Sequence, residues 1–229
     1  MLLFDQTHGC GIALYENAPE SVCLAARDVL DNLCRLAPGR KFDLDPEGIV
    51  SVRETGGEAE SYTVRVEKGG VFIDGADELG CIYGLYAFSR MLGVSPAYRL
   101  TDRFPDPKES LDLAEGVSVS PTRRVRFRGW FLNDEDLLSD FKGGGGKRTI
   151  DYPYYGHVIR PEVLDLVLET ALRLEMNLII PSSFVDVFNP AEEALIEGSV
   201  RRGLYVSQHH VEPMGVSYFS ARRVKVAPQ

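Results

Sequence analysis

The sequence has 229 residues, of which 44% are apolar and 26% are charged, and this balance excludes a disordered or fibrous chain. The formal net charge of -9 argues against a nucleic-acid partner, because phosphate binding depends on Lys and Arg. No segment is long enough to span a bilayer, so no membrane association is expected. The N-terminal stretch MLLFDQTHGCG meets a charge at Asp5 before an apolar segment can develop, which is unlike a signal peptide. We therefore expect a cytoplasmic protein, or a secreted or periplasmic one if an N-terminal segment is missing.

The cysteines show neither the paired spacing of a zinc site nor the density of a disulfide framework. They stand at Cys10, Cys23, Cys34 and Cys81. We expect ordinary reduced thiols, several of them buried, and no cofactor.

Residues 1–120 are predicted to form an α+β domain. A short strand at 11–16 precedes a helix within 18–39, and a second helix occupies 77–94. Two alternating runs flank Lys68-Gly69-Gly70 within 62–76, which is typical of a β-hairpin. The first helix has one apolar stripe: Val22, Ala25, Ala26, Val29, Leu30, Leu33 and Leu36. We expect its helices to cover a small, mostly antiparallel sheet.

A connector rich in prolines and acids follows at 95–121, with one strand predicted at 110–114. Residues 121–229 then alternate strands and helices, with strands expected at 124–132, 177–184 and 204–213. Helices are expected at 160–176 and 189–203, the second capped by Asn189 with Pro190 in its first position. Along the first of these helices, the predicted buried side includes Val163, Leu166, Val167, Thr170 and Leu174. Repeated β-α units favour a parallel sheet, and the pattern alone leaves a barrel and an open sheet both available.

Each of the three expected strands ends on polar residues. Because ligands bind beyond the carboxyl ends of parallel strands, these ends are the candidate site. They carry Asn133, Asp134 and Glu135; Ser182 and Ser183; and Gln208, His209, His210 and Glu212. A solvated loop or a helix cap explains the acidic pair at 134–135 equally well.

If the third strand continues far enough, alternation places His210 and Glu212 on one side and His209 on the other. A histidine and a carboxylate at this spacing could bind a sugar, share a proton or hold a metal. Metal is the weakest of these readings, because no third ligand is evident. The structural alternative packs His209 in the core and leaves His210 on a solvated loop.

The segment FKGGGGKRT, residues 141–149, does not fit a phosphate-binding P-loop. That motif requires Gly where Phe141 stands and Ser or Thr where Arg148 stands. We interpret it as a flexible loop that could fold over a ligand. Tyr152, Tyr154 and Tyr155 follow, as sugar-stacking or packing residues.

Three stretches together resemble glycoside hydrolase family 115, the xylan α-glucuronidases: GADELGCIYGLYAFSRMLGVSP, RFRGWFLNDED and SQHHVEPMGV. The resemblance implies a hexosaminidase-accessory-like domain followed by a (β/α)₈ catalytic barrel. It also implies removal of glucuronic acid, or its 4-O-methyl form, from decorated xylan with inversion. By this resemblance Asp134, Glu135 and Glu212 would be catalytic, while Asn133, His209 and His210 would bind the substrate.

The chain departs from the family in length. A complete barrel takes about 250 residues, whereas roughly 105 follow Arg124 here. Five strands and the expected catalytic acid are missing, so the second part is predicted to be an incomplete (β/α) barrel-type segment. Two hypotheses follow: a fragment or truncated relative of an α-glucuronidase, or a non-catalytic carbohydrate-binding or assembly module that forms a homodimer through its open sheet.

Overall fold

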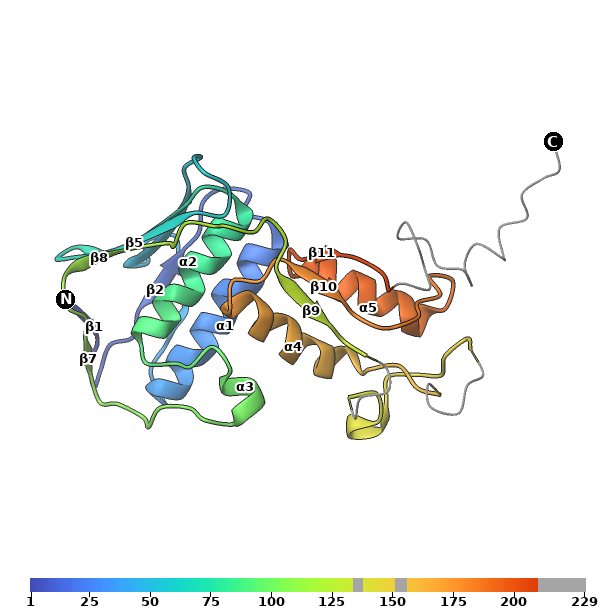
Figure 1. Ribbon diagram of the computed structural model, residues 1–229. Coiled ribbons are helices and arrows are strands. Elements are labelled where there is room, and N and C mark those ends of the chain that lie inside the picture. The colour runs from blue at the N-terminus through green and yellow to red at the C-terminus, as the bar shows by residue number, and fades with distance from the viewer. Residues whose placement is uncertain (134–137, 151–155, 210–229) are drawn as a thin grey trace. The chain divides into compact units, whose positions relative to one another are not determined.

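The structure is a computed structural model, and it describes residues 1–133, 138–150 and 156–209 (Figure 1). Two compact units are present, one of residues 1–126 and 172–175 and the other of residues 127–171 and 176–229. Both units mix helices and strands, which confirms the predicted α/β class. In the described ranges, no helix combines the length and apolar character needed to cross a membrane.

The first unit is built on a six-stranded sheet whose strand order is β3-β2-β4-β6-β5-β8. Its strands are β2 (Gly11–Ala13), β3 (Asp43–Leu44), β4 (Val50–Glu54), β5 (Tyr62–Glu67), β6 (Gly70–Gly75) and β8 (Gly116–Val119). A separate pair joins β1 (Leu2–Phe4) to β7 (Leu111–Asp112). The helices are α1 (Glu20–Leu36), α2 (Glu78–Met91) and the short α3 (Tyr98–Thr101).

The expectation of a mostly antiparallel sheet is wrong. The predicted hairpin is present as β5 and β6, and β8 also runs antiparallel to β5. However, β2 pairs in parallel with β3 and β4, and β4 pairs in parallel with β6. The reason is that α1 carries the chain back between β2 and β3, and such a crossover returns the next strand in the same direction. Neither β3 nor β4 was predicted from the sequence.

Helices α1 and α2 pack on each other, and α2 also packs on β4, β5 and β6. All seven residues of the predicted apolar stripe of α1 are buried. Asp77 caps α2, since its carboxylate accepts a hydrogen bond of 2.8 Å from Gly80 N. Gly84 lets α2 approach the sheet, because a Cβ there would lie 2.5 Å from Ile73 Cγ2. This close packing explains why α2 is buried on nearly all sides.

A buried polar network lies among the helices of the first unit. Asn32 Nδ2 donates to Tyr98 OH at 3.1 Å, and Asn32 Oδ1 accepts from Ser89 Oγ at 2.8 Å and Arg173 Nη2 at 2.8 Å. The Arg173 guanidinium also lies 4.5 Å from the ring centre of Tyr86 and 4.9 Å from that of Tyr98. The fully buried guanidinium therefore contacts a neutral acceptor and two aromatic faces.

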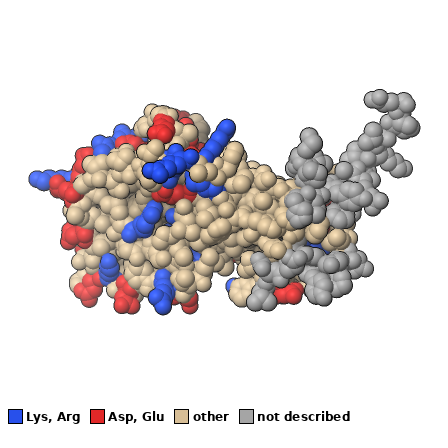
Figure 2. All heavy atoms as spheres, viewed as in Figure 1, with Lys and Arg blue, Asp and Glu red and all other residues tan. Residues whose placement is uncertain are grey.

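Charged side chains of both signs are interspersed over the first unit on the face that Figure 2 shows. On strands β4, β5 and β6 of this unit, Asp74 pairs with Arg53 at 3.0 Å and with Arg65 at 2.9 Å. Arg65 also pairs with Glu67 at 3.3 Å, so two carboxylates balance the two cations.

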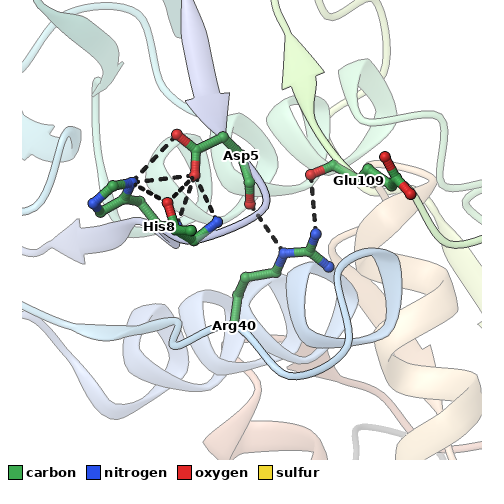
Figure 3. Close-up of polar contacts among 5 residues, drawn as sticks. Asp5, His8, Arg40 and Glu109 are labelled. Carbon is green, nitrogen blue, oxygen red and sulfur yellow. Dashed lines mark hydrogen bonds and ion pairs between the residues drawn. The ribbon is translucent and has the colours of Figure 1, made fainter.

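Polar contacts join the N-terminal segment to two later segments of the first unit (Figure 3). The Asp5 carboxylate accepts from the backbone N–H groups of Thr7 and His8, each at 2.8 Å. Arg40, which follows α1, donates to Asp5 O and to Glu109 O, each at 3.0 Å. The two N–H donors hold the pKa of Asp5 well below its usual value.

The second unit contains a three-stranded parallel sheet in the order β11-β10-β9. Its strands are β9 (Gly129–Phe131), β10 (Leu178–Ile180) and β11 (Tyr205–Val206). Between them lie the 3-10 helix η1 (Phe141–Gly143), α4 (Pro161–Arg173) and α5 (Pro190–Arg201). This order of strands and helices confirms the predicted β-α repetition and the parallel direction.

Two details of the second part differ from the expectations. Leu174, predicted to be buried, is 43% exposed, because α4 ends at Arg173 and the chain turns through a positive φ of 61° at Glu175. All three strands are also much shorter than predicted, and the third ends at Val206. The helix cap is as expected, with Asn189 Oδ1 accepting from Ala191 N at 3.3 Å.

Candidate functional site at the carboxyl edge of the parallel sheet

The ends of β9 and β10 meet at the carboxyl edge of the three-stranded sheet. The sheet pairing continues past β9, where Leu132 N donates to Ile180 O at 2.8 Å. One residue further, the Ser183 hydroxyl donates to Asn133 Oδ1 at 2.8 Å. Asn133 is half-buried and Ser183 is buried. Polar residues predicted at two separate strand ends are therefore in direct contact.

The third strand end joins the same edge. Ser207 N donates to Ile179 O at 3.0 Å, which extends the pairing beyond β11. His209 then stacks on Phe131 of β9, with ring centres 4.3 Å apart and the ring planes 14° from parallel. Since β9 and β11 flank β10, this stacking brings side chains from both outer strands together over the edge. His209 is half-buried, which fits neither a core residue nor a fully solvated one.

Four of the predicted site residues lie outside the described residues: Asp134, Glu135, His210 and Glu212. His210 and Glu212 were predicted to share one side of a strand that continues to position 212, but β11 ends six residues earlier. Their roles stay predictions. Tyr152, Tyr154 and Tyr155 also lie outside the described residues.

Arg148 is buried at this edge. In the sequence it stands out only as a mismatch to the P-loop motif. Its guanidinium donates to Ser182 Oγ and to Phe184 O, each at 2.7 Å, and to His157 O at 3.0 Å. Arg148 therefore joins the end of the glycine-rich segment to the residues that follow β10. A buried arginine has no distinctive sequence signal here, because it follows glycines and a lysine in a segment typical of a loop.

Glu192 in the first turn of α5 provides a second connection between the same loops. Its buried carboxylate accepts from Thr149 N at 2.7 Å, from Asp186 N at 2.6 Å and from Asn189 Nδ2 at 2.9 Å. Thr149 belongs to the loop after β9, and Asp186 belongs to the loop after β10. One carboxylate thus holds both loops to the helix.

Residues 144–148 belong to the segment predicted to be a flexible loop, but they pack closely against residues 157–159. Gly145 N donates to Val158 O at 2.6 Å, and Val158 N donates to Gly146 O at 3.0 Å. A side chain at Gly145 would bring a Cβ within 2.6 Å of Ile159 O. The glycines here serve close backbone approach rather than freedom of movement.

The residues outside 134–137, 151–155 and 210–229 include no group of three or more His, Cys, Asp or Glu positioned to hold a metal ion. What these residues do offer at the carboxyl edge is an amide, two hydroxyls and an imidazole. Such groups can donate to and accept from several hydroxyl groups at once, as a polar ligand requires.

Comparison with known proteins agrees with this arrangement. Residues 120–225 match the family described as glycosyl hydrolase family 115. The search of curated proteins finds no match.

Three solved structures have the same fold over most of the chain. A family GH115 4-O-methyl-α-glucuronidase with specificity for decorated arabinogalactans has a TM-score of 0.76 at 21% identity, over 93% of this chain and 30% of that one. A GH20 exo-β-N-acetylglucosaminidase from Vibrio harveyi has a TM-score of 0.56 at 12% identity, over 90% of this chain and 33% of that one. A Streptomyces plicatus β-hexosaminidase has a TM-score of 0.55 at 18% identity, over 90% and 42% of the two chains.

The chain therefore spans about a third of the length of these enzymes, or somewhat more for the third. Its fold is that of an α+β domain followed by the first strands of a (β/α) barrel, as the sequence motifs implied. Residues 120–225 of this chain are therefore similar in sequence to glycoside hydrolase family 115, and the fold is similar to that of an enzyme of this family.

Proposed function

We propose that this protein releases glucuronic acid, or its 4-O-methyl form, from a decorated polysaccharide at the carboxyl edge of the β9-β10-β11 sheet. The observation that carries the proposal is the meeting of strand ends within the matched segment, where Asn133 bonds to Ser183 and Phe131 stacks on His209. An amide, a hydroxyl and an imidazole gathered at one edge suit the hydroxyl groups of a sugar.

In this proposal the carboxyl groups come from two different strand ends. Inverting glycoside hydrolysis needs an acid and a base about 6.5–9.5 Å apart, so that water can enter beside the sugar. Asp134 or Glu135 follows β9, and Glu212 follows β11 on the other side of β10. One group would protonate the leaving oxygen and the other would activate water. Asn133, His209 and His210 would hold the sugar hydroxyls.

The substrate class is a neutral polysaccharide that carries glucuronate side groups. The resemblance to glycoside hydrolase family 115 implies decorated xylan, whereas the GH115 enzyme of similar fold has specificity for decorated arabinogalactans. For either polysaccharide, the unit that this chain would recognise is the glucuronate side group.

A second function, carbohydrate binding without hydrolysis, has one observation in its favour. Among the described residues, β9 and β11 each lack a neighbour on their outer side. A homodimer formed through such an edge would be the corresponding assembly.

The experiment separates these functions by measuring release and binding on the same samples. The chain is incubated with glucuronate-bearing oligosaccharides of xylan and of arabinogalactan, and freed glucuronic acid is quantified by anion-exchange chromatography. Asp134→Asn and Glu212→Gln are compared with Asp106→Asn, an exposed residue of the first unit. Release that only the first two substitutions abolish supports hydrolysis. Saturable binding without release, lost in Asp134→Asn, supports the binding function, and absence of both contradicts both.

A further inference from the structure

The loop between β9 and α4 exposes an aromatic ring beside lysine side chains. Phe141 is 49% exposed, although it is a large apolar residue. Lys142 and Lys147 are also exposed in this loop, whereas Arg148 is buried. An exposed ring with ammonium groups nearby suits a ligand that has both an apolar face and polar groups.

The backbone that presents Phe141 is fixed by contacts on both sides. Gly143 N donates to Asp140 O at 3.0 Å, which closes η1, and Arg160 Nε donates to Gly144 O at 2.9 Å. Together with the pairing of 145–146 to Val158, these bonds fix the backbone of residues 140–146. A ligand that binds to these residues therefore does not first have to order them.

Lys142 adopts a conformation that non-glycine residues rarely take, with a φ of 60°. Its Nζ lies 5.6 Å from the centre of the Phe141 ring. An apolar ring face with an ammonium beside it matches a sugar, because the C–H face of the sugar covers the ring while the ammonium donates hydrogen bonds to the sugar hydroxyls. Unfavourable backbone geometry at this lysine is consistent with a functional requirement.

His157 lies against the same loop. Its Nδ1 is 3.0 Å from Asp140 Oδ1, and both side chains are exposed. A Cβ built at Gly144 would lie 3.0 Å from His157 Cβ, which shows how closely the two segments approach. The pair adds hydrogen-bonding groups next to the ring and the cation.

This surface adjoins the carboxyl edge through a chain of direct contacts. Arg148, at the end of the loop, bonds to Ser182 and to His157 O. Ser183, the next residue, bonds to Asn133. We propose that Phe141, Lys142 and His157 form a second subsite, which binds a further part of the uronate-bearing polysaccharide beyond the sugar held at the carboxyl edge. The subsite rests on the proposed function, because it assumes that the edge holds the terminal glucuronate.

The test compares a long ligand with a short one by isothermal titration calorimetry. Methyl glucuronide should bind only at the carboxyl edge of the parallel sheet, whereas a glucuronate-bearing oligosaccharide of several sugars should reach both the carboxyl edge and the second subsite. Phe141→Ala should weaken oligosaccharide binding about tenfold, the order expected for one lost aromatic contact. Lys142→Gly should weaken it about threefold, as for one lost hydrogen bond at an exposed position. Lys68→Gln, at an exposed turn of the first unit, is the matched control and should change nothing. None of the three should alter the affinity for methyl glucuronide.

Lys142→Gly also separates binding from stability. Glycine accepts a positive φ without strain, so the thermal midpoint should stay the same or rise while oligosaccharide affinity falls. A purely structural lysine would move both quantities in the same direction, which would overturn the subsite. The fluorescence of Trp130 checks that each variant is folded.

Two results refute the subsite in different ways. If both loop variants bind the oligosaccharide as tightly as the unsubstituted protein, the subsite is wrong and the proposed function stands. If the unsubstituted protein binds neither methyl glucuronide nor the oligosaccharide, the proposed function fails and the subsite fails with it.

Discussion

Replacing Glu192 by glutamine should destabilise the second unit. The carboxylate accepts three hydrogen bonds, two of them on Oε1 and one, from Asp186 N, on Oε2. Glutamine keeps a single acceptor oxygen, so its amide nitrogen must face at least one N–H donor at a buried position. Losing a hydrogen bond to a charged group and leaving its donor unsatisfied should cost about 2–5 kcal/mol of unfolding free energy.

Glu193→Gln is the control, because Glu193 is the next residue in the same first turn of α5 and is exposed. Both substitutions remove one negative charge from the helix N-terminus, worth about 0.3–1 kcal/mol, so the difference between them isolates the buried bonds. Trp130 on β9 is the single tryptophan, and its fluorescence during urea unfolding reports the second unit. Equal unfolding midpoints for the two variants would refute the role assigned to Glu192.

Three further outcomes are expected in the first unit. Asn32→Leu removes the common partner of Arg173, Ser89 and Tyr98, and should lower the unfolding free energy by about 3 kcal/mol or more in calorimetric melts, whereas an unchanged melt would contradict the network. Burial raises the pKa of the Cys10 thiol to about 12, so iodoacetamide at pH 8 should label Cys10 only after unfolding, whereas it should label the exposed Cys34 in the native protein. Detection of labelled Cys10 in the native protein by mass spectrometry would contradict this. The pKa of Asp5 is lowered in the folded state, so the Asp5 carboxylate stabilises the fold above the ordinary pKa range of a carboxyl group, and this stabilisation is lost as the pH falls below that range. The amides of Thr7 and His8 should therefore lose protection from hydrogen exchange on acidification, and Asp5→Asn should remove this pH dependence.

Helical periodicity carried most of the predictable part of the fold. The apolar stripe of α1 and the Asn189-Pro190 start of α5 were both identified, because caps and 3.6-residue spacing are local properties. The direction of the first sheet was not predictable in the same way. It depends on which strands pair across α1, and β3 is only two residues long.

The candidate site was likewise predictable only where it depends on local sequence. That Asn133 and Ser183 would lie at strand ends followed from counting residues along each strand, whereas their direct bond needed the pairing of β9 with β10. Arg148 and Glu192 were missed because their importance comes from burial between loops. In the sequence both stand among residues typical of solvent-exposed segments.

The glycine-rich segment shows why composition misleads. Four consecutive glycines normally indicate a flexible linker, since glycine has the largest backbone freedom. Here Gly145 is in close contact with the carbonyl of Ile159, and Gly146 with the side chain of Ala191. The absence of side chains permits close packing as well as movement, and only the surrounding structure distinguishes the two.

The most direct test of the central claim is an NMR titration of the amide-labelled protein with methyl glucuronide. The account predicts saturable shifts concentrated at Asn133, Ser183 and His209, with the first unit unaffected. Shifts confined to the first unit, or no saturable shift at all, would contradict a sugar site at the carboxyl edge of the parallel sheet.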